Sequence, residues 1–181
     1  MKEILKSPEE YGYVMGNGIC AFYIGPFSQW YGYFTGQYSW FVDSSLIAYN
    51  CCEQYMMEQK ALLFNSADAN LDIMNKILSE KNPAKQRELG RQIKNFDPTI
   101  WDENKYNIVL RGNAMKFHQN PHLAEFLKQF PIDTVFVEAS PADKIWGVGL
   151  AITDPRVLDQ SQWQGENLLG KVIQAVRKSL Q

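Results

Sequence analysis

The chain has 181 residues, of which 45% are apolar, and its 18 Lys and Arg against 20 Asp and Glu give a formal net charge of -2. This length and composition favour one domain with a single sizeable core. The near-neutral charge excludes a protein that coats extended nucleic acid through a general positive field. Any phosphate must therefore be recognised by a local basic cluster.

The sequence shows neither an apolar secretory signal nor the run of about 20 apolar residues that a membrane helix needs. Its cysteines fit neither a disulfide framework nor a CxxC pattern, because Cys51 and Cys52 are adjacent and Cys20 lies far away. We therefore expect a cytoplasmic protein with reduced thiols that does not bind membranes. Cys52 precedes a candidate catalytic glutamate, but free cysteine is usually a small buried hydrophobe, so Cys52 is not counted in the site.

Aromatic residues and glycines crowd residues 11–42, a composition that predicts short strands joined by tight turns. The character of the sequence changes after this segment. Asn50 is the expected cap of a helix that runs to about Phe64, and a second, amphipathic helix is predicted over Leu71–Ser79.

Start and stop signals define the next helices. Asn82-Pro83 opens a short helix that ends at Leu89, with Gly90 in the left-handed conformation that often follows a helix. A further helix is predicted from near Trp101 or Asp102 to about Phe117, and Asn120-Pro121 opens another.

The last third of the chain predicts one strand, one long loop and one helix. The β-branched and aromatic residues between Asp133 and Val137 indicate a buried strand, and a loop rich in Pro and Gly follows over Ser140–Asp154. Apolar residues from Leu168 to Val176 repeat at helical spacing and predict an amphipathic terminal helix. The whole is predicted to be one α+β domain over residues 1–181, mainly helical with a few short strands.

The first candidate site residues lie on the helix that follows Asn50. Glu53 and Lys60 are seven residues apart, so their side chains lie on about the same face and can address one pocket. A structural alternative remains open, since Glu53 can reach back to the helix N-terminus and Lys60 can be a solvated surface lysine.

The second candidate segment runs from Glu138 to Gly149 and combines acids, an indole and glycines at the end of a strand. Here too the alternatives stay open, because Asp143 can cap a turn, Trp146 can belong to the core and the glycines can serve the backbone. A third segment opens the terminal helix near Asn167, where free backbone N–H groups suit a phosphate.

Five motifs occur together in one order that resembles the NADAR superfamily, the YbiA-like N-glycosidases also met as riboflavin-biosynthesis-intermediate glycosidases. The resemblance covers roughly residues 20–179. The motifs are Glu-Gln-Tyr-Met-Met-x-Gln-Lys-Ala at 53–61, Leu89-Gly90-Arg91, Lys116-Phe117-His118-Gln119-Asn120-Pro121, Glu-x-x-x-x-Asp-x-x-Trp-Gly at 138–147 and Gly-x-Asn-x-Leu-Gly at 165–170.

Two features depart from the family pattern. Gln54 stands where many members carry His, which excludes an essential histidine at that position. The aromatic stretch from Tyr31 to Phe41 matches the pattern poorly, so the resemblance says least about substrate contacts in the N-terminal third.

The resemblance implies cleavage of a bond between ribose C1 and nitrogen, with Glu53 and Asp143 facing the ribose as stabiliser and base in an unassigned order. It also makes Lys60 a candidate nucleophile that holds the sugar as a ring-opened Schiff base until water releases it. The resemblance also implies that Trp146 stacks on the substrate, while Trp163 either stacks too or belongs to the core. It implies phosphate binding by Arg91 and by the helix that starts at Asn167. Further substrate contacts are implied for Gln54, Glu138 and Gly147.

Two substrate classes follow from the resemblance, namely ADP-ribosylated guanine, free or as a single base in nucleic acid, and phosphoribosylated aminopyrimidine intermediates of riboflavin synthesis. A non-catalytic ADP-ribose or nucleotide-binding module and a structural or partner-binding domain are the competing classes of function. We expect no cofactor, no metal and no obligate protein partner. His118 and His122 are four residues apart, but they straddle the helix break at Asn120-Pro121.

Overall fold

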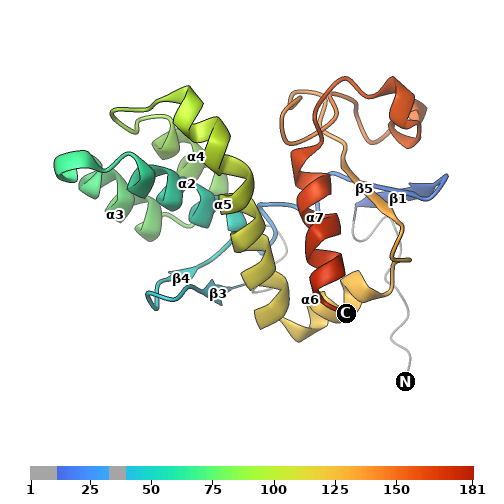
Figure 1. The fold of residues 1–181 in the computed structure, drawn as a ribbon, viewed down its shortest axis with the longest axis horizontal. Helices are drawn as coiled ribbons and strands as arrows, with labels where there is room; N and C mark the ends of the chain where they lie inside the picture. Colours follow the sequence, from blue (N-terminus) through green and yellow to red (C-terminus); the bar gives the residue numbers. More distant parts are fainter. Residues whose placement is uncertain (1–11, 33–39) are drawn as a thin grey trace. The chain divides into compact units, whose positions relative to one another are not determined.

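The computed structural model describes residues 12–32 and 40–181, and the chain divides into two compact units. One unit contains residues 1–28 and 121–181, and the other contains residues 29–120. Figure 1 follows both along the chain. The strands and turns predicted within residues 33–39 lie outside the described residues.

The first unit is built on a three-stranded mixed sheet, in the order β1-β2-β5. β1 (Tyr13–Gly16) and β2 (Ile19–Phe22) form an antiparallel hairpin, and β5 (Val135–Glu138) pairs with β2 in parallel, with Ile19 opposite Val135 and Phe22 opposite Glu138. The hairpin turn is Asn17-Gly18, and both residues have positive φ, of 53° and 73°. Asn-Gly adopts this geometry readily, which explains the tight connection.

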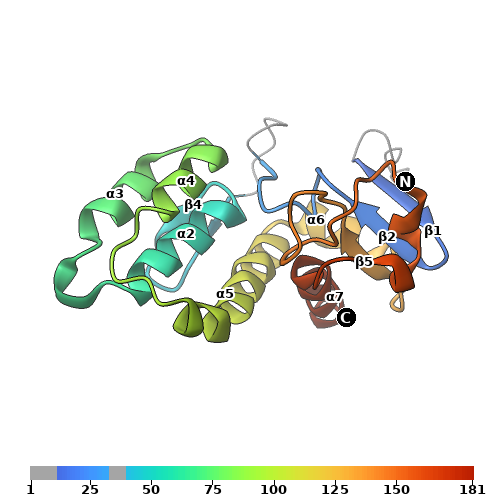
Figure 2. The same cartoon turned by 90° about the horizontal axis from the view of Figure 1, so that it is seen from above.

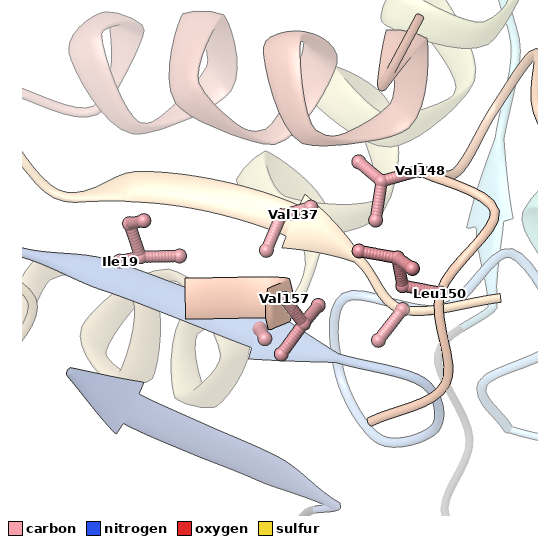
Figure 3. Close-up of a cluster of buried hydrophobic side chains, with 7 residues drawn as sticks. Ile19, Val137, Val148, Leu150 and Val157 are labelled. Carbon is pink, nitrogen blue, oxygen red and sulfur yellow. The ribbon is translucent and has the colours of Figure 1, made fainter. Parts of the chain in front are cut away.

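The two faces of this sheet carry different cores. In sequence, α6 (Pro121–Lys128) comes directly after the segment 29–120 that forms the other unit. The last helix, α7 (Leu168–Ser179), packs on β5, as Figure 1 shows. On one face the buried aliphatic side chains gather, and Figure 3 shows five of them pointing toward one another. The members of this cluster are Ile19, Ala21, Val137, Ala139, Val148, Leu150 and Val157.

The alternate strand residues belong to an aromatic cluster instead. Phe27 lies at its centre, with ring centroids 5.1 to 5.4 Å from those of Phe22, Phe126, Phe130 and Phe136. This division follows from the period of two along a strand, which sends Phe136 and Val137 to opposite faces.

The second unit is a helical group beside a small hairpin. β3 (Phe41–Val42) and β4 (Ala48–Tyr49) pair antiparallel, and α2 (Cys52–Leu63) follows directly. The helices α3 (Leu71–Ser79), α4 (Pro83–Gly90) and α5 (Pro98–Gln119) all pack against α2, and Figure 2 shows this group from a second side. Among the described residues of both units, the short 3-10 turns are Ser66–Asp68, Pro155–Leu158 and Gln160–Gln162.

Burial of α2 on nearly all sides explains its sequence. Its first seven residues, Cys52 to Glu58, are all buried, although two of them are glutamates and one is a glutamine. These first two turns have no solvent face, although Leu62 and Leu63 at the end of α2 are exposed, so the polar residues of the first turns need partners inside the protein. The candidate residue Glu53 therefore lies in the interior of this unit.

Most of the predicted elements are confirmed. The helix over Leu71–Ser79 has the predicted bounds, Asn82 caps α4 by accepting a hydrogen bond from the Ala84 N–H at 2.9 Å, and Asn120-Pro121 opens α6. The mainly helical α+β fold is also confirmed. In the described residues, no helix combines the length and apolar character needed to span a bilayer.

Two predictions about caps were wrong. The N-cap position of α2 is Cys51, whose side chain makes no capping bond. The Asn50 side chain instead donates to the Lys81 carbonyl at 3.0 Å and accepts from Gln86 Nε2 at 3.1 Å. Gly90 is the last helical residue of α4 and does not have a left-handed φ. The Met57 sulfur occupies the space where a Gly90 side chain would begin, so this glycine serves close packing against α2 and not a helix cap.

The start of α5 was also misplaced. It begins at Pro98, three residues before the predicted Trp101, because Asp97 Oδ1 accepts hydrogen bonds from the Thr99 and Ile100 N–H groups. Asp97-Pro98 repeats the signal of Asn82-Pro83, a cap residue followed by proline at the first helical position.

Candidate active site

Glu53 is the buried acid at the start of α2. Only 3% of its surface is exposed, and its Oε2 accepts a hydrogen bond from Trp30 Nε1 at 3.2 Å. Its backbone N–H donates to the Gln29 carbonyl at 3.1 Å. The carboxylate is thus held inside the protein by a side-chain donor from a segment that precedes the β3-β4 hairpin.

Lys60 lies two turns further along the same helix and is half-buried. Its ammonium donates a hydrogen bond to the Gly90 carbonyl at 3.1 Å and lies 4.4 Å from the centroid of the Phe96 ring and 5.4 Å from that of Trp101. Burial lowers the pKa of Lys60, while the Glu53 carboxylate raises it and the Arg91 guanidinium lowers it. The charges of Glu53 and Lys60 therefore interact, as their spacing on one helix predicted.

Two arginines of α4 lie beside these groups. Arg91 is the C-cap of α4, is exposed, and is near enough to Lys60 to affect its pKa. Arg87, one turn earlier, places its guanidinium carbon 5.2 Å from the centroid of the Trp30 ring. The region around Glu53 and Lys60 is thus a local basic cluster in a chain whose net charge is near zero.

Gln54 faces a different part of the structure from its neighbour Glu53. Its Nε2 donates to the carbonyls of Ile77, Leu78 and Glu80, and its Oε1 accepts from the Asn50 N–H. These contacts fasten the end of α3 to α2. The role of Gln54 in substrate binding stays a prediction.

Asp143, in the other unit, organises the loop after β5. Its Oδ1 accepts hydrogen bonds from the N–H groups of Ile145 and Trp146 at 2.9 and 2.8 Å. The turn-capping alternative from the sequence is therefore present. Among the described residues, nothing donates to its second oxygen, Oδ2, so that oxygen is available for other chemistry.

The loop is closely packed around two glycines. A side chain at Gly147 would lie 2.8 Å from the Glu138 carbonyl, and one at Gly165 would collide with the Gly147 carbonyl. Trp146, which is half-buried, lies in the same loop. The glycines of this motif thus serve a close backbone approach, the structural alternative that the sequence left open.

Asn167 joins this loop to β5. It has a φ of 55°, its Oδ1 accepts from the Glu138 N–H at 3.1 Å, and its Nδ2 donates to the Phe136 carbonyl at 2.9 Å. Its side chain makes no capping bond to α7. Trp163 packs against the aliphatic cluster and donates to the Val157 carbonyl at 2.9 Å, which confirms the core alternative for this residue.

A family model described as the NADAR domain matches residues 22–181 of the chain. The protein belongs to the NADAR family. The chain is 42% identical to the N-glycosidase R617 of Acanthamoeba polyphaga mimivirus over 86% of its own length and 87% of that protein. It is also 28% identical to the chloroplastic riboflavin biosynthesis protein PYRR of Zea mays, over 71% of its own length but only 19% of that protein.

The fold has a solved counterpart. The NMR structure of the Escherichia coli protein YbiA matches 98% of this chain and 93% of that chain with a TM-score of 0.66 and 20% sequence identity. The NADAR match includes segments of both compact units, and the single domain predicted over residues 1–181 stays a prediction.

The predicted site residues of this NADAR protein fall into two sets. Glu53, Gln54, Lys60 and Arg91 belong to the unit of residues 29–120, whereas Glu138, Asp143, Trp146, Gly147 and Asn167 belong to the other. In the first set Glu53, Lys60 and Arg91 interact electrostatically, whereas Gln54 contacts the end of α3. The prediction that both sets surround one anomeric carbon stays a prediction.

Sequence reasoning missed three groups of the NADAR domain. The half-buried Trp30 and the exposed Arg87 were not selected, because no spacing rule links residue 30 with residues 53 and 87. Lys116 is fully buried beneath the Phe117 ring, with its ammonium 4.9 Å from the centroid, and burial lowers its pKa. The position of Lys116 in the motif at residues 116–121 was the one sequence feature that could have marked it as a residue of interest.

Cys52 is also a buried group, with 1% of its surface exposed, and burial raises the pKa of its thiol. A thiol in this state is a poor nucleophile, which agrees with leaving Cys52 out of the site. Across residues 12–32 and 40–181, no three His, Cys, Asp or Glu side chains gather in a way that could hold a metal ion.

Proposed function

We propose that this NADAR protein is a hydrolase that cleaves the N-glycosidic bond between ribose C1 and a base or amine. The observation that carries the proposal is the pairing, on one helix, of the buried Glu53 carboxylate with a Lys60 amine whose pKa is lowered by burial. The relative of 42% identity, which is named an N-glycosidase, supports the same class of reaction.

The proposed chemistry uses the amine as a nucleophile. Neutral Lys60 attacks ribose C1 as the bond to the leaving nitrogen breaks, and that nitrogen takes a proton. The ring then opens to an imine, and water adds to this imine, releasing the ribosyl group and restoring the amine. A lowered pKa favours this step because more of the lysine is neutral at a given pH.

Two carboxylates complete the proposed mechanism. Positive charge develops at C1 as the glycosidic bond breaks, and Glu53 and Asp143 are proposed to stabilise that charge and to activate water. The role of Asp143 is supported by its second oxygen, Oδ2, which is available because both N–H groups of the turn donate to Oδ1. A pure binder of anionic phosphates gains nothing from acids beside the sugar, so these groups favour an enzyme over a binding module.

The proposed substrates carry phosphate and a planar base. Arg91, in the basic cluster beside Lys60, is proposed to bind phosphate, and Trp146 to stack on the base. The N–H groups expected to be free at the start of α7 are not, because those of Asn167, Leu168 and Leu169 donate to the carbonyls of Gly147, Ile145 and Trp146. ADP-ribosylated guanine and phosphoribosylated aminopyrimidines both meet this description. The relative named a riboflavin biosynthesis protein supports the second class.

One incubation tests the proposed reaction. The purified protein is mixed with each substrate class in the presence of a chelator, and mass spectrometry follows the released base and sugar phosphate. Release from either class, slowed by about a hundredfold or more in Glu53→Gln and retained in Lys85→Ala, a change at an exposed lysine of α4, is the expected result. Binding without release by the unaltered protein would overturn the enzyme proposal and indicate a nucleotide-binding module.

A further inference from the structure

Trp30 touches the candidate acid from outside its helix. The indole N–H donates to Glu53 Oε2 at 3.2 Å, and the carbonyl of the preceding residue, Gln29, accepts the Glu53 backbone N–H at 3.1 Å. Residues 29 and 30 therefore fix both the backbone and the carboxylate of the first turn of α2.

This dipeptide is itself held by α5. Asn113, which is fully buried, donates from Nδ2 to Gln29 Oε1 at 2.7 Å and to the Val109 carbonyl of its own helix at 2.9 Å. Gln29 is 8% exposed, so this bond is shielded from water and gains strength from the low local dielectric. The orientation of Trp30 thus depends on α5 as well as on α2.

Arg87 contacts the face of the same indole. Its guanidinium carbon is 5.2 Å from the ring centroid, within the range of a cation–π interaction. The edge of the Trp30 ring donates to Glu53 while its face lies against Arg87. Two perpendicular contacts therefore fix the plane of the ring and the direction of its N–H.

We propose that Trp30 is the positioning residue for Glu53, with Arg87 holding the indole in place. A hydrogen bond to a carboxylate stabilises its charged form, and a donor fixed in direction also selects one rotamer of the acid. Glu53 then meets the developing charge at C1 already ionised and oriented, which avoids a reorganisation during the reaction. The inference rests on the proposed glycosidase activity.

Other charged and titratable groups act on Glu53 or on its partners. The Glu53 charge acts on Cys51, the N-cap residue of α2, and on Cys52 and Lys60 within that helix. Arg87 contacts Trp30, Arg91 acts on Lys60, and Lys116 acts on Cys52. Replacing Trp30 by phenylalanine changes none of these titratable groups and retains an aromatic ring, but it removes the indole N–H together with part of the ring.

The test measures kcat, KM and the pH–rate profile of Trp30→Phe. We expect kcat to fall by about ten- to a hundredfold, the effect of losing a hydrogen bond to a charged group, with KM within about twofold. The acid limb of the profile should move to higher pH, because loss of the donor favours the protonated acid. Trp163→Phe removes an indole hydrogen bond from the core of the other unit and should change neither kcat nor the acid limb.

A double-mutant comparison separates positioning from folding. Trp30→Phe should have no further effect on kcat in a Glu53→Gln background, since the carboxylate that it positions is already gone. If Trp30→Phe shows no cooperative melting transition, Arg87→Gln replaces it, and a several-fold loss of kcat with the same shift of the acid limb is expected.

Two outcomes are distinguishable. An unaltered protein that releases no base refutes the proposed function, whereas an active protein whose kcat and acid limb do not change on the substitution Trp30→Phe refutes only the positioning role. Equal losses from this substitution with and without the Glu53 carboxylate would also overturn it.

Discussion

The start of α2 and the loop after β5 carry the same kinds of residue but use them differently. In α2, the Glu53 carboxylate is held by an indole from a distant segment and Lys60 has a pKa lowered by burial. In the loop, Asp143 Oδ1 and the side chain of Asn167 bind backbone groups of the loop and the strand. Burial alters reactivity in the helix, whereas hydrogen bonding maintains shape in the loop.

This difference suggests a division of labour between the two regions. A helix enclosed by other helices removes water from its polar groups and changes their proton affinity. A loop whose side chains form hydrogen bonds with its own backbone keeps a fixed conformation, and so a fixed surface for contact with a substrate. Asp143 is the exception to test, since one of its oxygens is not used in the turn.

The largest expected effect is that of removing the Lys60 amine. Lys60→Ala should lower kcat/KM by about a thousandfold or more, because a covalent nucleophile has no substitute in the site. Borohydride added during turnover should attach ribosyl mass to Lys60, identified by peptide mass spectrometry. Lys85→Ala is the control, and a Lys60→Ala protein with full activity would exclude Lys60 as the nucleophile.

Asp143 sharpens the comparison between helix and loop. Asp143→Asn keeps an oxygen that accepts from the Ile145 and Trp146 N–H groups, so the melting temperature should stay unchanged while kcat falls by roughly a hundredfold. Asp143→Ala should lower both kcat and the melting temperature, since the turn loses its cap. Full activity of Asp143→Asn would show that Asp143 only maintains the conformation of the loop and has no catalytic role.

The pH response of Lys60 tests whether burial alters its reactivity. Its lowered pKa means that acylation of Lys60, followed by peptide mass spectrometry, should rise and level off at lower pH than for an ordinary lysine. Glu53→Gln removes a charge that raises this pKa, so the rise should move to still lower pH. Arg91→Gln removes a charge that lowers it and should move the rise to higher pH. If neither variant shifts the pH profile of Lys60 acylation, the charges of Glu53 and Arg91 do not affect the pKa of Lys60, which contradicts the prediction.

The smallest effects concern packing glycines in the two units. A side chain at Gly170 in α7 would collide with the Phe136 backbone carbonyl, so Gly170→Ala should destabilise the protein by about 3 kcal/mol. At Gly90 the obstacle is the flexible Met57 side chain, and a gain in helix propensity offsets part of the strain, so Gly90→Ala should cost about 1 kcal/mol or less. Urea unfolding of both variants measures the difference, and equal losses would be contrary to this account.

Local signals predicted the elements whose ends are decided by neighbouring residues. Asn82-Pro83 and Asn120-Pro121 marked the starts of α4 and α6, and periodic apolar residues marked α3. The predictions for Asn50 and Gly90 were wrong because distant residues decide their roles. Asn50 forms hydrogen bonds with Lys81 and Gln86, and Gly90 packs against Met57. A cap residue with a better partner elsewhere does not cap, and a glycine at a helix end can serve packing against a neighbouring helix.

The sequence by itself determined the family, the class of fold and the pairing of Glu53 with Lys60, since helical spacing and short motifs are local properties. The tertiary structure decided the surroundings of these groups: the indole that holds Glu53, the burial that lowers the pKa of Lys60 and the strand that Asn167 joins to its loop. Proton affinity and orientation depend on desolvation and on donors from distant segments, and folding alone brings these together.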